Sequence, residues 1–305
     1  GILCILIGLI FLYQEELKTL YNKYLNKENF SMKLTDHNEY YRDYDFDFVK
    51  RTTNTSPTSK KDLYNIYYSV LNSGKTSFSF YCPNKYQNCL SDVKDIANDQ
   101  TLLSHINNFV HPFNSFKNIE TEYNSYGKIS IKITHTYDSN TINLINNKVS
   151  EIKNSLLLQP NLSDVEKIKI YHDYIVNNNK YDSDRSDNNI IKYKSDIAYG
   201  PLFDSAYGAL IEHYAICGGY TDLMAIFLND MNIKNYKVSS ENHVWNVLYL
   251  NGNWLNLDLT WDDPITNDGT DIIEYSFFLI NTKKLEQIEK NQHLFDKEIY
   301  KEIAN

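Results

Sequence analysis

The sequence lacks an excess of positive charge: 30 Lys and Arg residues face 39 Asp and Glu residues, a net charge of −9 at pH 7. This balance argues against nucleic acid as a partner, because binding to phosphates depends on clustered basic side chains. Cysteine is also scarce, with four among 305 residues. Cys82 and Cys89 are accompanied by no second cysteine pair and no spaced histidine pair, so a structural zinc site is not favoured. Hydrophobic residues make up 42% of the chain, which is enough for an ordinary core.

A hydrophobic run of membrane-spanning length is missing as well. Residues 1–13 (GILCILIGLIFLY) are almost wholly apolar, but a typical transmembrane helix needs about 20 residues. We interpret the segment as part of a signal peptide or N-terminal anchor, with a buried core helix as the alternative. The expected location is therefore extracellular or cell-surface, either secreted or membrane-anchored. In that oxidising compartment Cys82 and Cys89 are expected to form a disulfide, which leaves Cys217 as the odd thiol downstream of the segment.

Cys217 opens a segment whose pattern predicts a helix with a strongly apolar face. Residues 221–228 (TDLMAIFL) continue it, and Gly218 and Gly219 follow the cysteine directly. Free amides and the positive end of the helix dipole at such a start favour a thiolate and could bind a developing oxyanion. The small glycines also permit close approach of a substrate backbone. The ordinary alternative for one cysteine in an apolar segment is a small buried hydrophobe.

A β-hairpin is predicted downstream of this helix. Residues 243–250 are rich in strand-forming side chains, and residues 253–261 alternate between polar and apolar. The intervening Asn251-Gly252 is the strongest short-range signal for a two-residue hairpin turn. With these two residues as the loop, Leu250 pairs with Asn253.

The same register brings a histidine and a carboxylate together. Counting back along the hairpin, Trp245 pairs with Asp258 and His243 with Thr260. Alternation then places all four side chains on one face, with His243 and Asp258 as diagonal neighbours within side-chain reach. A slip of one residue would separate them. Thiol, imidazole and carboxylate are the parts of a cysteine nucleophile with its general base and orienting group. Taken alone, a strand histidine is more often a satisfied or exposed residue than a catalyst.

Four motifs in chain order resemble the bacterial transglutaminase-like superfamily: AYGAL at 206–210, CGGY at 217–220, HVWN at 243–246 and DLTWDDP at 258–264. The resemblance covers roughly residues 155–305. It implies a papain-like core in which a helix-borne cysteine faces histidine and aspartate on neighbouring strands. It also implies a nucleophile role for Cys217, a general-base role for His243 and an orienting role for Asp258. It does not fix the reaction, because members include protein cross-linking enzymes, peptidases, amidases and inactive relatives.

Three further residues are candidates for substrate contact. Gly218 lies beside the cysteine and Trp245 lies on the face that carries His243 and Asp258. Tyr207, in the first motif, is a candidate for assisting the oxyanion.

The expected fold class is α+β, with a papain-like core of helices packed on an antiparallel sheet at residues 151–305. A small α+β domain of unknown role precedes it at 60–150, after a juxtamembrane helix and polar linker at 14–59 and the hydrophobic segment at 1–13. In the small domain we predict helices at 61–71, 90–109 and 141–157, and strands at 76–81, 119–123 and 128–137. Ser163 and Glu166 form a capping-box pattern that begins a helix, in which His172 is predicted to be a packed core histidine.

The function predicted from the sequence is that of an exported cysteine enzyme that transfers an acyl group from a protein or peptide amide through a thioester. The chemistry requires no cofactor, and no metal site is predicted. The expected partner is an extracellular or cell-wall protein or peptide, with membrane attachment only if the N-terminal segment is retained. Two alternatives remain: a cysteine peptidase or amidase with water as the acceptor, acting on extracellular protein or peptidoglycan, and a catalytically idle binding module.

Overall fold

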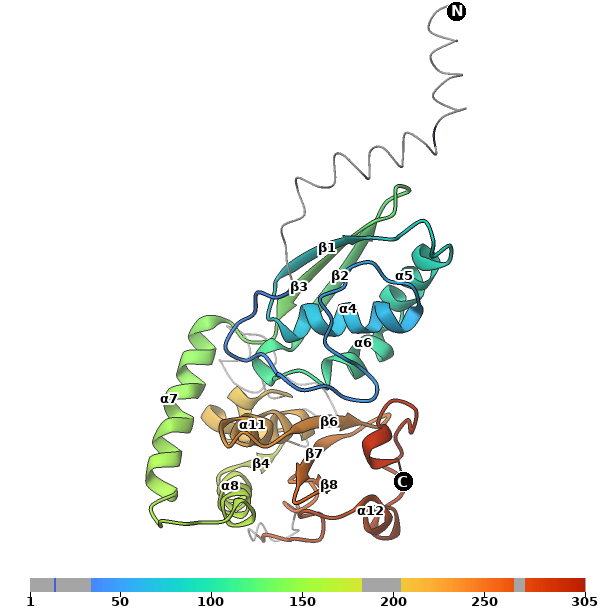
Figure 1. The fold of residues 1–305 in the computed structure, drawn as a ribbon. Coiled ribbons are helices and arrows are strands. Elements are labelled where there is room, and N and C mark those ends of the chain that lie inside the picture. Colours follow the sequence, from blue (N-terminus) through green and yellow to red (C-terminus); the bar gives the residue numbers. More distant parts are fainter. Residues whose placement is uncertain (1–13, 15–33, 183–203, 266–271, 305) are drawn as a thin grey trace, which may run out of the picture.

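Figure 1 presents the protein as a computed structural model, which describes residues 14, 34–182, 204–265 and 272–304. The hydrophobic segment predicted at 1–13 lies outside these residues. Within the described ranges, every helix is too short or too polar to cross a bilayer. The described elements combine α-helices with two three-stranded antiparallel sheets, in agreement with the mixed helix and strand pattern expected from the sequence.

The first sheet and its helices lie in the upper part of Figure 1. The sheet has the strand order β1-β3-β2, so the last strand in sequence is central. Apolar side chains on one side of these strands face the helices, while the opposite positions are exposed or half-buried. The elements are α4 (Lys60–Asn72), β1 (Ser77–Tyr81), α5 (Cys89–Asn98), α6 (Gln100–Asn107), β2 (Phe116–Tyr123) and β3 (Lys128–His135).

The single helix predicted at 90–109 is in fact two, so that prediction was wrong. Asp99 separates α5 from α6, with φ −93° and ψ 86°, which is not a helical conformation. Its side chain accepts a hydrogen bond from the Leu102 N–H at 2.9 Å and so caps α6. An aspartate that bonds to nearby backbone amides competes with helix continuation, and that local preference outweighs the apolar periodicity on both sides.

Residues 34–59 follow an irregular path but do not behave as a solvated linker. Phe46, Phe48 and Val49 are buried in the core. Arg42 is also buried, and its guanidinium donates to the Phe109 carbonyl at 2.9 Å and to the Asn235 side chain at 3.0 Å. The polar composition of this stretch concealed the apolar side chains that it contributes. The segment thus ties the first sheet region to the second.

The second sheet and its helices occupy the lower part of Figure 1, and the long helix α7 runs along one side. Helix α11 packs against strands β6 and β7 and against α8. A short parallel pairing of β4 with β5 lies before α11. The elements are α7 (Ser139–Leu156), α8 (Asp164–Asn178), β4 (Lys180–Tyr181), β5 (Tyr214–Ala215), α11 (Cys217–Asp230), β6 (Asn235–Ser239), β7 (Val244–Leu250), β8 (Asn253–Leu257) and α12 (Thr282–Ile288).

The predicted hairpin has the predicted register. Leu250 pairs with Asn253, and the pairing continues without a bulge to Asn246 opposite Leu257. The second strand ends there, short of the predicted residue 261, so the predicted pairs Trp245–Asp258 and His243–Thr260 are not part of the ladder. Asn251 and Gly252 have φ of 51° and 84°, the left-handed values that a type I′ turn requires at both central positions. The capping box at the start of α8 is confirmed too, because Ser163 and Glu166 exchange the expected bonds. The register determines where the side chains of the site meet.

Two clusters of buried side chains form the core. One packs helices α7, α8 and α11 together, and the other joins the first sheet region to the second sheet. In the latter cluster Phe46 and Phe109 contact Tyr236 from β6, with ring centroids 5.4 and 5.1 Å apart. The backbone makes the same connection, since the Lys237 N–H donates to the Asn108 carbonyl at 3.0 Å. Both regions therefore contribute to the surroundings of the site at the start of α11.

Candidate functional site

Cys217 is the first residue of α11 and is half-buried. Ile216 before it is extended, with φ −98° and ψ −176°, so the chain enters the helix at a sharp angle. The amides of the first helical turn have no carbonyl one turn earlier to bond, and the helix dipole adds positive potential at this end. The sequence predicted this position for the cysteine. The surroundings favour a negative charge on the sulfur or on an oxygen bound next to it.

Asp204 lies against this helix start. Its carboxyl group accepts a hydrogen bond from the Gly218 N–H. A Cβ atom added at Gly218 would come within 1.8 Å of the Asp204 Oδ1 atom, so only glycine allows this approach. The residue as a whole has exposed surface, but burial of its carboxyl group and the nearby Asp222 raise the pKa of Asp204 to about 6. A carboxylate thus competes for the amides that an oxyanion would use.

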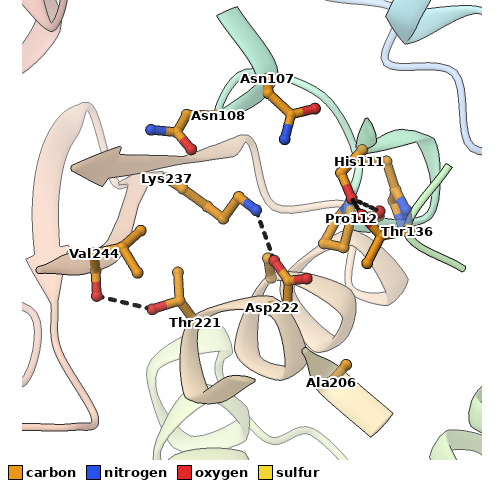
Figure 2. Close-up of polar contacts among 12 residues, drawn as sticks. Asn107, Asn108, His111, Pro112, Thr136, Ala206, Thr221, Asp222, Lys237 and Val244 are labelled. Carbon is orange, nitrogen blue, oxygen red and sulfur yellow. Dashed lines mark hydrogen bonds and ion pairs between the residues drawn. The ribbon is translucent and has the colours of Figure 1, made fainter. Parts of the chain in front are cut away.

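Two hydrogen bonds fix the first turn of α11 to strand β7. The Thr221 hydroxyl donates to the Val244 carbonyl at 3.0 Å, as Figure 2 shows. In return, the Asn246 side chain donates to the Thr221 carbonyl at 3.0 Å. Because Val244 adjoins His243, these bonds hold the sulfur and the imidazole at a fixed separation.

The structure brings Cys217, His243 and Asp258 together. The His243 Nε2 atom lies 2.5 Å from Asp258 Oδ2, and the ring also shares a hydrogen bond with the Cys217 side chain. Since Nε2 is engaged by the carboxylate, Nδ1 is the nitrogen left for the sulfur. Asp258 Oδ1 accepts from the backbone N–H groups of Thr260 and Trp261, at 3.0 and 3.3 Å. These bonds lock the carboxylate in the orientation that holds the ring.

His243 and Asp258 carry opposite charges that stabilise each other. His243 is 6% exposed and Asp258 is 1% exposed. Burial alone would lower the pKa of His243, but Asp258 and Cys217 together raise it to about 10. Burial would raise the pKa of Asp258, yet His243 and a second histidine, His293, hold it well below its usual range. The imidazole therefore carries its proton at neutral pH.

Sequence reasoning missed His293. Its Nε2 atom lies 2.9 Å from the same Asp258 Oδ2 atom, and its Nδ1 atom lies 3.0 Å from Glu289 Oε2. The residue is 2% exposed. It stands 35 residues beyond Asp258 and belongs to none of the four motifs, so no pattern around the triad pointed to it. The only sequence signal that could have indicated the contact of His293 with Glu289 is their separation by four positions.

His243, Asp258 and His293 also form a group that could in principle hold a metal ion. Ligand atoms in a tetrahedral zinc site with bonds of about 2.0–2.1 Å are roughly 3.3 Å apart. Here both nitrogens are closer than that to the shared oxygen, at 2.5 and 2.9 Å. The spacing fits protons between nitrogen and oxygen, whereas a metal ion would have to push the three side chains apart.

A polar cavity of about 390 Å³ is lined by residues of both sheet regions, and Cys217 and His243 are not among them. Gly218 and Val244, the neighbours of Cys217 and His243, are part of its wall. Figure 2 shows Lys237 and Asp222 in this wall, joined by an ion pair of 2.7 Å. A larger cavity of about 620 Å³ lies elsewhere, beside residues 39–44, without a cysteine in its wall. The remaining lining residues of the polar cavity include Ser104, Asn107, Asn108, Ser115, Thr136, Asp204 and Ser239.

The three residues predicted to contact the substrate, Gly218, Trp245 and Tyr207, lie in different surroundings. Gly218 lines the polar cavity, and its contact with a substrate stays a prediction. Trp245 does not fit a substrate contact, because it is fully buried, donates to the Asn256 side chain and lies beside the His243 ring at 5.8 Å. Alternation along the strand put Trp245 on the correct face but could not show that this face is covered. Tyr207 is half-buried and packs against the helical core cluster.

Cys82 and Cys89 are joined by a disulfide, with their Cα atoms 5.6 Å apart. Among the residues that the structure describes, Cys217 is then the free cysteine. His172, predicted to be a packed core histidine, is fully buried in α8, where it also bonds to two carboxylates.

Comparison with known proteins gives structural matches over about half of this chain. No family model matches the chain, and no curated protein matches it either. Among solved structures, one described as a TGase has a TM-score of 0.34 and 17% identity, covering 48% of this chain and 45% of its own. A candidate cysteine protease from Cytophaga hutchinsonii has a TM-score of 0.27 and 14% identity, covering 51% of this chain and 65% of its own. The likeness thus spans about half of this chain and less than two thirds of either structure.

Proposed function

We propose that this protein is a transglutaminase-like cysteine enzyme that transfers an acyl group from an amide through a thioester on Cys217. The observation that carries the proposal is the contact of the half-buried Cys217 with the buried His243 and Asp258 at the start of a helix. A thiol, a protonated imidazole and a locked carboxylate in hydrogen-bond contact are the elements of nucleophilic catalysis by cysteine. Each side chain has a distinct part in the reaction.

The reaction proceeds in two halves. The Cys217 sulfur attacks the amide carbonyl carbon as a thiolate, and backbone amides at the helix start stabilise the oxyanion. His243 gives its proton to the leaving nitrogen as the C–N bond breaks, which leaves a thioester and a free amine or ammonia. An incoming amine then attacks the thioester, His243 takes up its proton, and the thiolate leaves. Asp258 keeps the imidazole in one orientation throughout.

The polar cavity beside Gly218 and Val244 is the proposed place for the acyl donor. Its wall offers amide and hydroxyl groups together with the Lys237 ammonium, which suits the carbonyl oxygens of a peptide or a side-chain amide. The oxyanion site lies at the helix start, where the Asp204 carboxyl now accepts the Gly218 N–H. Binding of the donor carbonyl would therefore displace that carboxyl group.

Hydrolysis is the second candidate, favoured by the polar character of the same cavity. A wall of serine, threonine and asparagine side chains admits water, and water in place of the amine would release a free acid. An extracellular or cell-wall protein or peptide is the proposed substrate in either case. The Cys82–Cys89 disulfide supports an oxidising location outside the cytoplasm.

The first test is the rate of Cys217 alkylation by iodoacetamide from pH 5 to pH 9, located by mass spectrometry. Wild type, His243→Ala and glutathione as a reference thiol would be compared. We expect rapid labelling at pH 6 in wild type, because the imidazolium stabilises a thiolate there, and loss of that labelling in His243→Ala. Labelling that rises only above pH 8 and ignores the substitution would refute the catalytic proposal and leave a binding module.

The second test separates the two acceptors. A glutamine-containing protein would be incubated with the enzyme and a fluorescent primary amine, and both amine incorporation and release of free acid would be measured. Incorporation that depends on Cys217 supports transfer. Release of acid or peptide without incorporation, again dependent on Cys217, assigns the protein as a hydrolase.

A further inference from the structure

A second buried histidine stands behind the Asp258 carboxylate. His293 lies between two acids, with 2.9 Å from Nε2 to Asp258 Oδ2 and 3.0 Å from Nδ1 to Glu289 Oε2. Glu289 also accepts from the N–H groups of Asn291 and Gln292, each at 2.9 Å, and these bonds together with His293 lower its pKa despite partial burial. Both acids are thus held as carboxylates that face the ring.

Counting donors gives the state of the His293 ring. A neutral imidazole has one N–H group, so one of the two carboxylates would face a nitrogen lone pair. Only a ring protonated on both nitrogens satisfies both contacts. Aromatic side chains surround the ring, with centroids at 4.8 Å for Trp245, 5.4 Å for Phe277 and 5.6 Å for Trp261.

We propose that His293 is a positioning residue of the Cys217 site: held as an imidazolium between Glu289 and Asp258, it orients the Asp258 carboxylate and offsets its charge toward His243. This rests on the proposed function, because the consequence for chemistry runs through the Cys217–His243 pair. Asp258 Oδ2 is shared by the two imidazoles, so a proton donated from His293 limits how strongly the carboxylate attracts His243.

The sign of the effect follows from the charges around the pair. Asp258 and His293 face His243 on one side and Cys217 faces it on the other. The next ionisable groups are Asp262 with His172, one turn beyond Asp258, and Asp204, Asp222 and Lys237 on the cavity side. Removal of the His293 cation leaves this set more negative. Loss of a proton from either Cys217 or His243 then becomes harder, and both limbs of the pair's pH profile move to higher pH.

The decisive variant is His293→Gln, which retains an N–H donor toward Asp258 but removes the charge. We expect both limbs of the Cys217 alkylation profile to move upward by roughly 0.5–1 pH unit, with a plateau rate within about threefold of wild type. His293→Leu removes donor and charge together, and its plateau is expected to fall at least tenfold. His172→Gln is the matched control, because it alters a buried histidine that lacks contact with the pair, and its limbs should stay in place.

A measurement that does not depend on catalysis tests whether His293 is held as an imidazolium between Glu289 and Asp258. In ¹⁵N-labelled full-length wild type, the His293 ring signals are assigned by their disappearance in His293→Gln. Protons on both ring nitrogens at pH 7 support the proposal, and a neutral tautomer overturns it even if Cys217 is active. An activated Cys217 with limbs unmoved in His293→Gln also overturns it. If wild-type Cys217 proves inert, the proposed function fails. The ring signals still decide whether His293 carries a proton on both nitrogens between Glu289 and Asp258.

Discussion

Two buried histidines, His293 and His172, have nearly the same surroundings, because each lies between two carboxylates. Only the group around His293 also includes a contact with a thiol, which is made by His243. His293 bridges Asp258 and Glu289, and His172 bridges Asp262 and Asp173 at 3.1 and 3.0 Å. The two bridged aspartates lie one turn apart and are linked by the bond from the Asp262 N–H to the Asp258 carbonyl. Burial, carboxylates and aromatic neighbours are therefore common to both groups.

The difference lies in what the shared aspartate holds on its other side. Asp258 holds a second imidazole, His243, which reaches the sulfur at the start of α11. Asp262 instead accepts the Phe277 N–H at 2.9 Å, so its other oxygen anchors a backbone loop. A buried ion pair is thus no sign of catalysis by itself. It becomes a site where the same carboxylate also orients a base against a nucleophile.

The largest effect is expected from removing the thiol, which distinguishes the group around Asp258 from the group around Asp262. In Cys217→Ser no thioester can form, and we expect turnover to fall by at least about 10³-fold, because an alcohol at this position is a much weaker nucleophile than a thiolate. Turnover of the amide substrate would be measured beside the melting temperature. A half-buried single-atom change should leave the melting temperature within a few degrees. Turnover that persists in the variant would contradict the nucleophile role.

The two aspartates themselves provide the next test. Asp258→Asn should retain the geometry but lose the charge that orients and protonates His243, with an expected loss of about 10²–10⁴-fold in kcat/KM. Asp262→Asn is the matched change in the other group, and its expected effect is on stability, by about 1–3 kcal/mol, with kcat/KM changed less than tenfold. Equal losses of kcat/KM in the two variants would remove the functional distinction between the groups.

The contribution of His243 to the unfolding free energy should depend on pH in a defined direction. The pKa of His243 is raised to about 10 in the folded protein from an ordinary value near 6.5. Its stabilising contribution is therefore complete below about pH 6.5 and is lost as pH rises toward 10. Chemical unfolding of wild type and His243→Gln would be compared across this range. The difference in unfolding free energy should shrink steadily with pH, and a constant difference would show that the proton on His243 does not stabilise the fold.

The smallest expected effect concerns Gly218. In Gly218→Ala the new methyl group displaces the Asp204 carboxyl from the helix start. Cys217 loses a nearby carboxylate, so alkylation near pH 6 should become faster, by roughly two- to fivefold. Asp204→Asn is the companion variant, since it removes the charge without a clash, and it should change the rate in the same direction. Slower alkylation in both would indicate that Asp204 supports the thiol.

The central pair of this comparison could be predicted from the sequence, and the reason is geometrical. Asn251-Gly252 fixes the hairpin turn and the turn fixes the register. His243 and Asp258 directly adjoin the ends of the two strands, where they meet. The helix that begins at Cys217 was predicted in the same way, from local periodicity. Every step depends on neighbours within one hairpin or one helix, where pattern and structure are directly linked.

The remaining features of the site depend on contacts between distant segments. His293 reaches Asp258 from a loop after α12, and Asp204 reaches Gly218 from a turn that ends in the first motif. The burial of Trp245 is likewise set by Phe295 and His293 from the C-terminal part of the chain. No local pattern encodes which face of a strand is covered by a segment 50 residues away.

Arg42 has a practical consequence for anyone who would shorten this protein. Its backbone exchanges hydrogen bonds with the Asn72 side chain, while its guanidinium holds Asn235 and the Phe109 carbonyl. A fragment beginning at residue 60, although it retains every regular element from α4 onward, would leave these buried polar groups without their donor. The irregular stretch before α4 works as an internal strap, so the smallest unit that can be expected to fold extends well upstream of the thiol-bearing half.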